Sequence, residues 1–252
     1  MLGHLFRRAG VKHFYIHNIT GIDPPELIYF QRRNFQHYRN LGYITHDIMY
    51  TKSMWALMEH KKFPPLRQIR YCCTHLKEVR KQEQADSLMS LGVRKNESRS
   101  RARNRDELEV SQGKRKSILL SFDDDDNRRD FEVCYRDHEK RLNPIVNWTS
   151  EDIWNYSIDA KLEQCRLYQE GFHRLGCIGC PMAREAGRRQ ELERWPGFKK
   201  LYLRTFQKML DIRTQLGMTV LNLGETAEEW FEWWLSDKAQ EQVDENQIDL
   251  WS

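Results

Sequence analysis

A long apolar run is the first thing that the sequence lacks. No apolar stretch approaches the roughly 20 residues that a transmembrane helix needs, and 31% of the 252 residues are charged. The first residues also lack the basic-then-apolar order and the small-residue cleavage site of a secretory signal peptide. We therefore expect a cytoplasmic protein that has no membrane partner.

A strong excess of one charge is also missing, because 41 lysines and arginines face 37 acidic residues and leave a net charge of +4. The basic residues are unevenly spread, and nine of them stand against four acids between Arg94 and Lys116. Such a stretch forms either a solvated surface or a site for the phosphates of a nucleotide or a nucleic acid. Composition alone leaves both interpretations open.

Cysteine is scarce, but four of the six cysteines stand in two close pairs. In a chain that is expected to be cytoplasmic, paired thiols indicate a metal site rather than disulfides. One pair is Cys177 and Cys180, within the sequence GCIGCP at 176–181, and the other is Cys72 with Cys73. Glycines leave room where backbone approaches inorganic sulfide, and a proline after a ligand cysteine is typical of iron–sulfur sequences. We therefore predict that these four cysteines bind one [4Fe–4S] cluster.

Two other interpretations of the cysteines remain open. Zinc also binds sets of four cysteines that contain Cys-x-x-Cys. The adjacent Cys72 and Cys73 reach one small ion with difficulty, whereas a cubane cluster offers four separate corners. The third interpretation is a set of unrelated reduced thiols or disulfides.

Residues 11–27 have the pattern of a strand, a loop and the start of a helix. Residues 11–19 are β-branched and aromatic, and the helix is predicted to begin with Asp23 as N-cap and Glu26 as its capping-box partner. A loop that follows a strand and opens a helix is where α/β proteins bind anionic ligands. The alternative is an ordinary capped helix without a ligand.

Length and element pattern predict the rest of the fold. A chain of 252 residues can bury one core and a small appendage. Strand-like and helix-like segments alternate, which predicts an α/β fold with an open, mostly parallel sheet flanked by helices. The charged segment 103–116 is predicted to be a mobile loop. The other expected elements are strands at 91–93, 118–122 and 131–135, and helices at 51–60, 74–90, 185–216 (interrupted at Pro196) and after the N-caps Thr149 and Thr226.

Together these motifs make the chain resemble the phosphoadenosine phosphosulfate reductase family of PP-loop enzymes. Residues 92–102, GVRKNESRSRA, are similar to the family pattern Gly-hydrophobic-Arg-x-x-Gln/Glu-Ser-x-x-Arg-Ala. Residues 20–26, TGIDPPE, are similar to Thr-Gly-x-x-x-Pro-Glu, and residues 144–154, PIVNWTSEDIW, to the family's Trp-Thr/Ser segment. The two cysteine pairs resemble the ligands of its iron–sulfur members, and the likeness runs from about Val11 to Met182 in family order.

The resemblance implies an adenine-nucleotide alpha-hydrolase-like domain at 1–182 and a helical C-terminal extension at 183–252 packed on it. It also implies an adenine nucleotide or sulfonucleotide as ligand, whose phosphate or sulfate oxygens suit the fork of an arginine side chain. Surface salt bridges are the alternative role for the arginines. The nucleotide- and anion-binding residues that the resemblance implies are Thr20, Gly21, Asp23, Arg94, Glu97, Ser98 and Arg101.

The sequence departs from the family pattern in two places. The Ser-Gly-Gly-x-Asp-Ser PP-loop is absent, and residues 2–8 look like the tail of a helix, so we expect an N-terminally truncated fold. No cysteine follows Cys180, where the reductases carry a C-terminal nucleophile, so no catalytic residue is assigned. The resemblance favours an enzyme of sulfur transfer or nucleotide activation. The alternative is a catalytically inactive regulatory or nucleic-acid-binding homologue that keeps the fold and the cluster.

Overall fold

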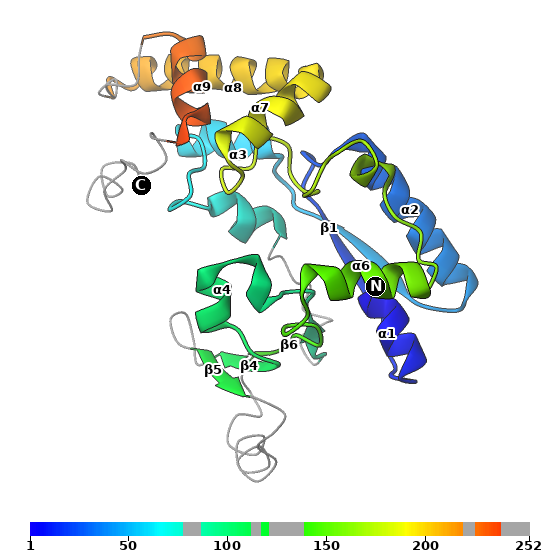
Figure 1. Ribbon diagram of the computed structural model, residues 1–252. Helices are drawn as coiled ribbons and strands as arrows, with labels where there is room; N and C mark the ends of the chain where they lie inside the picture. The colour runs from blue at the N-terminus through cyan, green and yellow to red at the C-terminus, as the bar shows by residue number, and fades with distance from the viewer. Residues whose placement is uncertain (78–86, 112–116, 121–138, 219–224, 238–252) are drawn as a thin grey trace. The chain divides into compact units, whose positions relative to one another are not determined.

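A computed structural model gives the fold of this chain, and it describes residues 1–77, 87–111, 117–120, 139–218 and 225–237. The chain divides into two compact units, each made from separate stretches of sequence. The first unit comprises residues 1–13 and 80–164, and the second comprises residues 14–79 and 165–252. Both units combine helices with strands (Figure 1), which confirms the predicted α/β class. Residue 182 lies inside the second unit, and the division into domains at that residue stays a prediction.

A two-stranded parallel sheet lies in the second unit. Strand β1 (Tyr15–Ile19) pairs with β2 (Thr45–Met49) along its whole length, and helix α2 (Pro25–Asn40) connects them. Figure 1 shows α2 lying alongside β1. The ring of Tyr38 on this helix stacks on Tyr15, with 4.2 Å between the ring centroids. The predicted strand, loop and helix at residues 11–27 are therefore present.

The start of α2 differs from the prediction. The N-cap residue is Pro24, which provides no side-chain cap, and the helix begins at Pro25. Asp23 is not the N-cap, because its Oδ2 atom accepts a hydrogen bond of 2.5 Å from the hydroxyl of Thr20. Prolines fix φ near the helical value without any cap. The side chain of Asp23 is therefore committed to the loop that precedes the helix.

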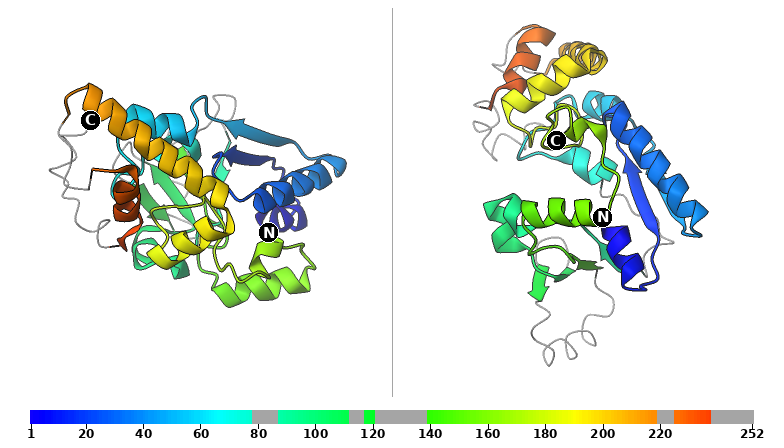
Figure 2. Two further views of the ribbon diagram at one scale, coloured as in Figure 1. Left: turned by 90° about the horizontal axis from the view of Figure 1, so that it is seen from above. Right: turned by 45° about the vertical axis from the view of Figure 1, so that its right-hand side comes forward.

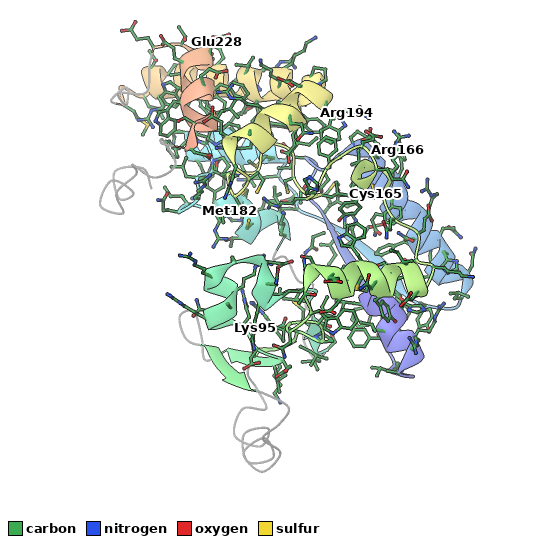
Figure 3. The ribbon with its side chains drawn as sticks, viewed as in Figure 1. Lys95, Cys165, Arg166, Met182, Arg194 and Glu228 are labelled. Carbon is green, nitrogen blue, oxygen red and sulfur yellow. The ribbon has the colours of Figure 1, made fainter. Side chains whose placement is uncertain are left out.

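Glu26 joins the start of α2 to more distant parts of the second unit instead of closing a capping box. Its carboxylate accepts hydrogen bonds from Nη2 of Arg194 at 2.9 Å, Nε1 of Trp195 at 3.1 Å and Nη2 of Arg166 at 3.4 Å. Figure 3 shows Arg166 and Arg194 close together. Burial alone would raise the pKa of Glu26, but its own backbone amide and these donors hold it below its ordinary value.

Four helices of the second unit pack together. The long helix α8 packs against the other three (Figure 2). The predicted interruption at Pro196 is confirmed, because one helix ends at Arg194 and the next begins at the proline. The four helices are α3 (Met54–Lys61), α7 (Glu185–Arg194), α8 (Pro196–Gln215) and α9 (Ala227–Leu235).

An aromatic core holds these helices together. Trp230 and Trp234 of α9 are completely buried, and Trp234 lies against Tyr202 of α8 with 4.9 Å between ring centroids. The predicted cap of α9 is confirmed, since the hydroxyl of Thr226 accepts a hydrogen bond of 3.2 Å from the amide of Glu229.

A buried arginine and an aspartate lock the end of α9. Arg188 of α7 has no exposed surface and donates to two carbonyl oxygens at the end of α9, at 2.9 and 2.7 Å. It also pairs with Asp237 at 3.1 Å. The Asp237 carboxylate accepts further bonds from Arg67 at 2.5 Å and from the amide of Glu185 at 3.1 Å. Asp237 therefore caps the start of α7 from a distant part of the chain.

The first unit contains a four-stranded sheet in the order β3-β6-β4-β5. The strands β3 and β6 are parallel, whereas β4 runs antiparallel to both of its neighbours, so this sheet is mixed. Its helices are α1 (Leu2–Arg8), α4 (Arg99–Asn104) and α6 (Ser150–Asp159). The strands are β3 (Met89–Ser90), β4 (Leu108–Ser111), β5 (Ser117–Leu120) and β6 (Glu139–Leu142).

The prediction that residues 103–116 form a mobile loop is wrong for the part of this segment that the structure describes. Residues 108–111 form β4, in which Leu108 and Glu109 are buried. The Glu109 carboxylate is paired with Arg105 at 2.5 Å and accepts a hydrogen bond of 2.7 Å from Asn143. These contacts neutralise the charge that made the segment look like a solvated loop.

Other predictions are confirmed, shifted or untested. The cap of α6 is confirmed, because the Thr149 hydroxyl and the Asp152 carboxylate bond to each other's amides at 3.1 and 2.7 Å. The strand expected at 91–93 lies two residues earlier, at β3. The strand expected at 131–135 and most of the helix expected at 74–90 lie outside the described residues. The end of that helix is wrong, because residues 89–90 form β3. Within the described part of the chain, no helix has the length and apolar character needed to cross a bilayer.

Replacing Asp237 with asparagine is expected to lower the free energy of unfolding by about 1 kcal/mol, because the buried Arg188 loses its charged partner. Burial raises the pKa of Asp237, but the Glu185 amide and the two arginines outweigh burial and hold it below the ordinary value. The stabilisation is therefore present above the pH at which an unfolded aspartate titrates. It is lost as the pH falls through the lowered pKa.

Thermal unfolding of both proteins between about pH 7 and pH 3 measures this difference. Glu193→Gln on the exposed face of α7 is the matched control and should unfold with the wild type. A gap between wild type and Asp237→Asn that stayed constant over the whole pH range would contradict the assignment.

Candidate functional site

Four cysteines from two distant parts of the sequence line one cavity in the second unit. Cys72 and Cys73 lie at the start of a short π-helical turn (Cys73–Lys77), and Cys177 and Cys180 lie in the loop before α7. No disulfide joins the five cysteines that the structure describes. The structure thus brings together all four predicted metal ligands. Thr20 and Tyr202 are also among the residues that line the cavity.

The loop from Cys177 to Cys180 is a tight β-turn that requires glycine. It is closed by a hydrogen bond of 3.2 Å from the amide of Cys180 to the carbonyl of Cys177. Gly179 has a φ of +71°, a value that side chains disfavour. A Cβ atom there would also lie 3.1 Å from Trp234 and 3.1 Å from Tyr202. Both the backbone conformation and the close packing therefore oppose a side chain at this position.

Hydrogen bonds fix the backbone of this turn from several sides. The amide of Ile178 donates to the carbonyl of Ile22 at 2.8 Å. Tyr202 donates to the carbonyl of Ile178 at 2.8 Å, and the amide of Gly179 donates to the carboxylate of Glu191 at 2.8 Å. Since buried backbone groups need partners, these bonds stabilise one conformation of the turn.

The loop predicted to bind a nucleotide lies directly against the cysteines. The hydroxyl of Thr20 is 3.7 Å from Sγ of Cys177, a residue 157 positions later in the chain. The same hydroxyl donates to Asp23 and accepts a bond of 3.3 Å from the amide of Ile22. Gly21 has a φ of +76°, which glycine adopts without strain. Thr20, Gly21 and Asp23 thus form one loop beside the metal-ligand candidates.

Lys77 supplies a positive charge to the cavity. Its ammonium group is hydrogen-bonded to the thiol of Cys177. Burial lowers the pKa of Lys77, but Cys177 and the other nearby cysteines outweigh burial and raise it above the ordinary value. Burial raises the pKa of Cys177 to about 11, against the opposing effect of Lys77. The hydrogen bond to Cys73 and burial also raise the pKa of Cys72. In this structure, burial and neighbouring cysteines therefore favour neutral thiols over thiolates at Cys72 and Cys177.

Sequence reasoning missed four residues that hold this site. Lys77 stands four residues after Cys73. In a helix, residues four positions apart lie on the same face, so a helix at this point would bring Lys77 beside Cys73. Arg67 donates to the carbonyl of Pro181 at 3.0 Å. Neither Glu191 nor Tyr202 carries a motif in the sequence, because their contacts with the turn exist only in the folded chain.

The cysteines fit the donor set of an iron–sulfur cluster or a zinc ion. Thiolates are soft ligands that suit both. All four cysteines line one cavity, and Gly179 keeps the turn between two of them free of a side chain. Across the described ranges, no group of three or more His, Cys, Asp or Glu side chains is arranged to hold a metal ion. Metal binding therefore stays a prediction.

The arginine-rich segment forms a compact ion-pair group in the first unit. The carboxylate of Glu97 pairs with Arg94 at 3.6 Å and also contacts Arg101. Arg94 donates to the hydroxyl of Ser150 at 3.2 Å. The hydroxyl of Ser98 caps α4 by accepting a bond of 3.1 Å from the amide of Arg101. The structure thus brings these four predicted residues together, with both guanidinium groups facing the same carboxylate.

The predicted nucleotide-binding residues are divided between the two units. The Thr20 loop belongs to the second unit, and the segment from Arg94 to Arg101 belongs to the first. Each group is assembled within its own unit by the contacts described above. That both groups bind one nucleotide stays a prediction.

Comparison with known proteins gives one family match. The sequence model of the phosphoadenosine phosphosulfate reductase domain matches residues 1–183. A phosphoadenosine 5′-phosphosulfate reductase of Xylella fastidiosa is 35% identical over 68 residues, which are 27% of this chain and 29% of that protein. An adenosine 5′-phosphosulfate reductase of Oceanobacillus iheyensis is 32% identical over 57 residues, which are 23% of this chain and 24% of that protein.

A third relative is an uncharacterised 37.8 kDa protein of Escherichia phage 186, which is 38% identical over 53 residues. The match covers 21% of this chain and 16% of the phage protein. In each of these three relatives, the aligned segment thus spans less than a third of the protein's length.

Replacing Gly179 with alanine is expected to destabilise the protein by roughly 1–3 kcal/mol, because the left-handed conformation and the contacts with Tyr202 and Trp234 both oppose a Cβ atom. Gly176→Ala is the matched control, since nothing lies within 4 Å of a Cβ at that position. Denaturant unfolding of both variants measures the difference. Equal stabilities for the two variants would show that the turn does not need glycine.

Proposed function

Because this chain belongs to the phosphoadenosine phosphosulfate reductase family, we propose that it is an iron–sulfur protein that acts on an adenylated or sulfur-bearing nucleotide. The reaction would be sulfur transfer or nucleotide activation. The observation that carries this proposal is the convergence of four cysteines on a cavity that Thr20 also lines. A metal group held there would lie beside the loop that resembles the family's nucleotide-binding segment.

Cys72, Cys73, Cys177 and Cys180 would hold a [4Fe–4S] cluster, and zinc is the alternative metal. A bound cluster supplies a polarising, redox-capable centre whose properties depend on neighbouring charges and hydrogen bonds. The residues of the chain that would act on this centre include Lys77, Thr20 and Arg174, whose Nη2 atom lies 3.7 Å from Sγ of Cys180. Lys77 balances the negative charge of the sulfur atoms, and Thr20 gives Cys177 a hydroxyl partner.

Arg94 and Arg101 would hold the phosphate or sulfate group of the nucleotide. Guanidinium groups bind such anions through paired hydrogen bonds. In this structure the Glu97 carboxylate contacts both arginines. A bound anion must therefore compete with this carboxylate for at least one of them. Ser98 can still donate its hydroxyl proton while its oxygen caps α4.

A second candidate function is a catalytically inactive homologue that binds nucleic acid or regulates a partner. The sharing of Glu97 between Arg94 and Arg101 favours it, because the carboxylate already contacts both arginines that would bind the anion of a nucleotide. Arg99 and Arg103 on α4 are exposed and add positive charge to the same short helix. A positively charged surface of this kind suits phosphates in general.

The cluster is tested by anaerobic purification followed by iron, sulfide and zinc analysis. We expect about four iron and four sulfide per chain, and a strong loss of both in a Cys177→Ser/Cys180→Ser variant. Cys165→Ala is the matched control, because Cys165 is buried in the same unit but does not line the cavity. Stoichiometric zinc without iron, or full iron in the double variant, would refute the cluster.

The anion site is tested by titrating the protein with phosphoadenosine phosphosulfate and with ATP in a calorimeter. Arg94→Ala should weaken binding by roughly 10- to 100-fold, because a lost charge-assisted contact is worth about 1.5–3 kcal/mol. Arg99→Ala, on the exposed surface nearby, should keep the wild-type affinity. If both variants bind nucleotide as the wild type does but lose affinity for an oligonucleotide, the second candidate function is favoured.

A further inference from the structure

The peptide between Ile178 and Gly179 stands at the centre of the cysteine turn and has both of its polar ends engaged. Its carbonyl accepts the hydroxyl of Tyr202 at 2.8 Å, and its amide donates to Glu191 at 2.8 Å. The carbonyl and amide of a trans peptide point in opposite directions. Tyr202 and Glu191 therefore hold the same peptide plane from two sides.

The orientation of this peptide plane determines the type of the turn. Gly179 occupies the third position of the turn with a φ of +71°, and Ile178 is not among the residues with positive φ, as in a type II turn. A type I turn has a negative φ at the third position and differs by a flip of the central peptide. Glycine at the third position permits the type II conformation without excluding type I, so contacts from outside the turn can stabilise one of the two. A flip would break both 2.8 Å bonds and leave buried polar groups unpaired.

Both partners come from outside the segment that the family model matches. That segment ends at residue 183, whereas Glu191 lies on α7 and Tyr202 on α8. Glu191 is half-buried, and burial raises its pKa against the lowering effect of the Gly179 amide. Tyr202 is almost completely buried, and it also lines the cysteine cavity. Burying a carboxylate costs free energy unless it is hydrogen-bonded, and the Gly179 amide supplies that bond.

We propose that Glu191 and Tyr202 are positioning residues that lock the Ile178–Gly179 peptide in the type II conformation and so determine how firmly Cys177 and Cys180 hold their metal group. The proposal rests on the proposed function for the presence of that group. The C-terminal helices are then part of the metal site, although they contribute no ligand. Residues that orient metal ligands typically change metal affinity by roughly 10- to 100-fold when they are removed.

The first experiment measures the rate at which the anaerobically loaded full-length protein loses iron to a chelator. Glu191→Ala and Tyr202→Phe should each release iron about tenfold faster or more. Glu191→Gln keeps an oxygen that accepts the Gly179 amide, and it should restore most of the wild-type rate. Glu193→Gln removes a charge from the exposed face of the same helix and should change nothing. Equal rates for Glu191→Ala and Glu193→Gln would overturn the proposal.

The second experiment needs no metal. The chain has 13 glycines, few enough to resolve by selective ¹⁵N-glycine labelling and NMR. In the metal-free protein, the Gly179 amide should exchange with solvent at least about tenfold faster in Glu191→Ala than in Glu193→Gln or the wild type. Unchanged exchange would show that the lock does not exist. If the wild type binds neither iron nor zinc, the proposed function fails. The exchange rate of the Gly179 amide still shows whether Glu191 holds the Ile178–Gly179 peptide in place.

Discussion

The hydrogen bonds to the Ile178–Gly179 peptide are the contacts on which the cysteine cavity depends. They fix the turn that carries two of the four cysteines, and Gly179 lets Tyr202 and Trp234 approach to 3.1 Å from where its Cβ would be. The same turn holds the Thr20 loop through the bond from Ile178 to the carbonyl of Ile22. One short segment therefore carries two of the four thiols and contacts both the Thr20 loop and the C-terminal helices.

Electrostatics differ between the two candidate sites. In the cysteine cavity, Lys77 faces several thiols, and Arg174 contributes a second positive charge with its Nη2 atom 3.7 Å from Sγ of Cys180. In the arginine segment, Glu97 faces two cations, Arg94 and Arg101, and the balance leaves a small positive surplus that an anion can use. Under the proposed function, the first arrangement would hold the metal group, and the second would hold the phosphate or sulfate of the nucleotide.

Sequence reasoning succeeded where the determining contacts are local. The cap of α6 was predictable because Thr149 meets a side chain only three residues away. Asp23 failed as a cap because neighbouring prolines made a cap unnecessary. The charged segment around Glu109 was misread, since its burial depends on partners elsewhere in the fold. Lys77 could have been found from its spacing after the cysteine pair. Glu191 could not, because nothing in the sequence ties it to a turn 12 positions earlier.

The packing of Trp234 against Gly179 bears on where this protein can be cut. A fragment chosen by family likeness would stop at residue 183 and would keep every cysteine of the cavity. It would also strip the apolar cover from one side of the turn and expose surface that the intact chain buries under α8 and α9. The boundary of inherited sequence similarity and the boundary of the cooperative folding unit are therefore different, and expression of the bare family segment invites aggregation.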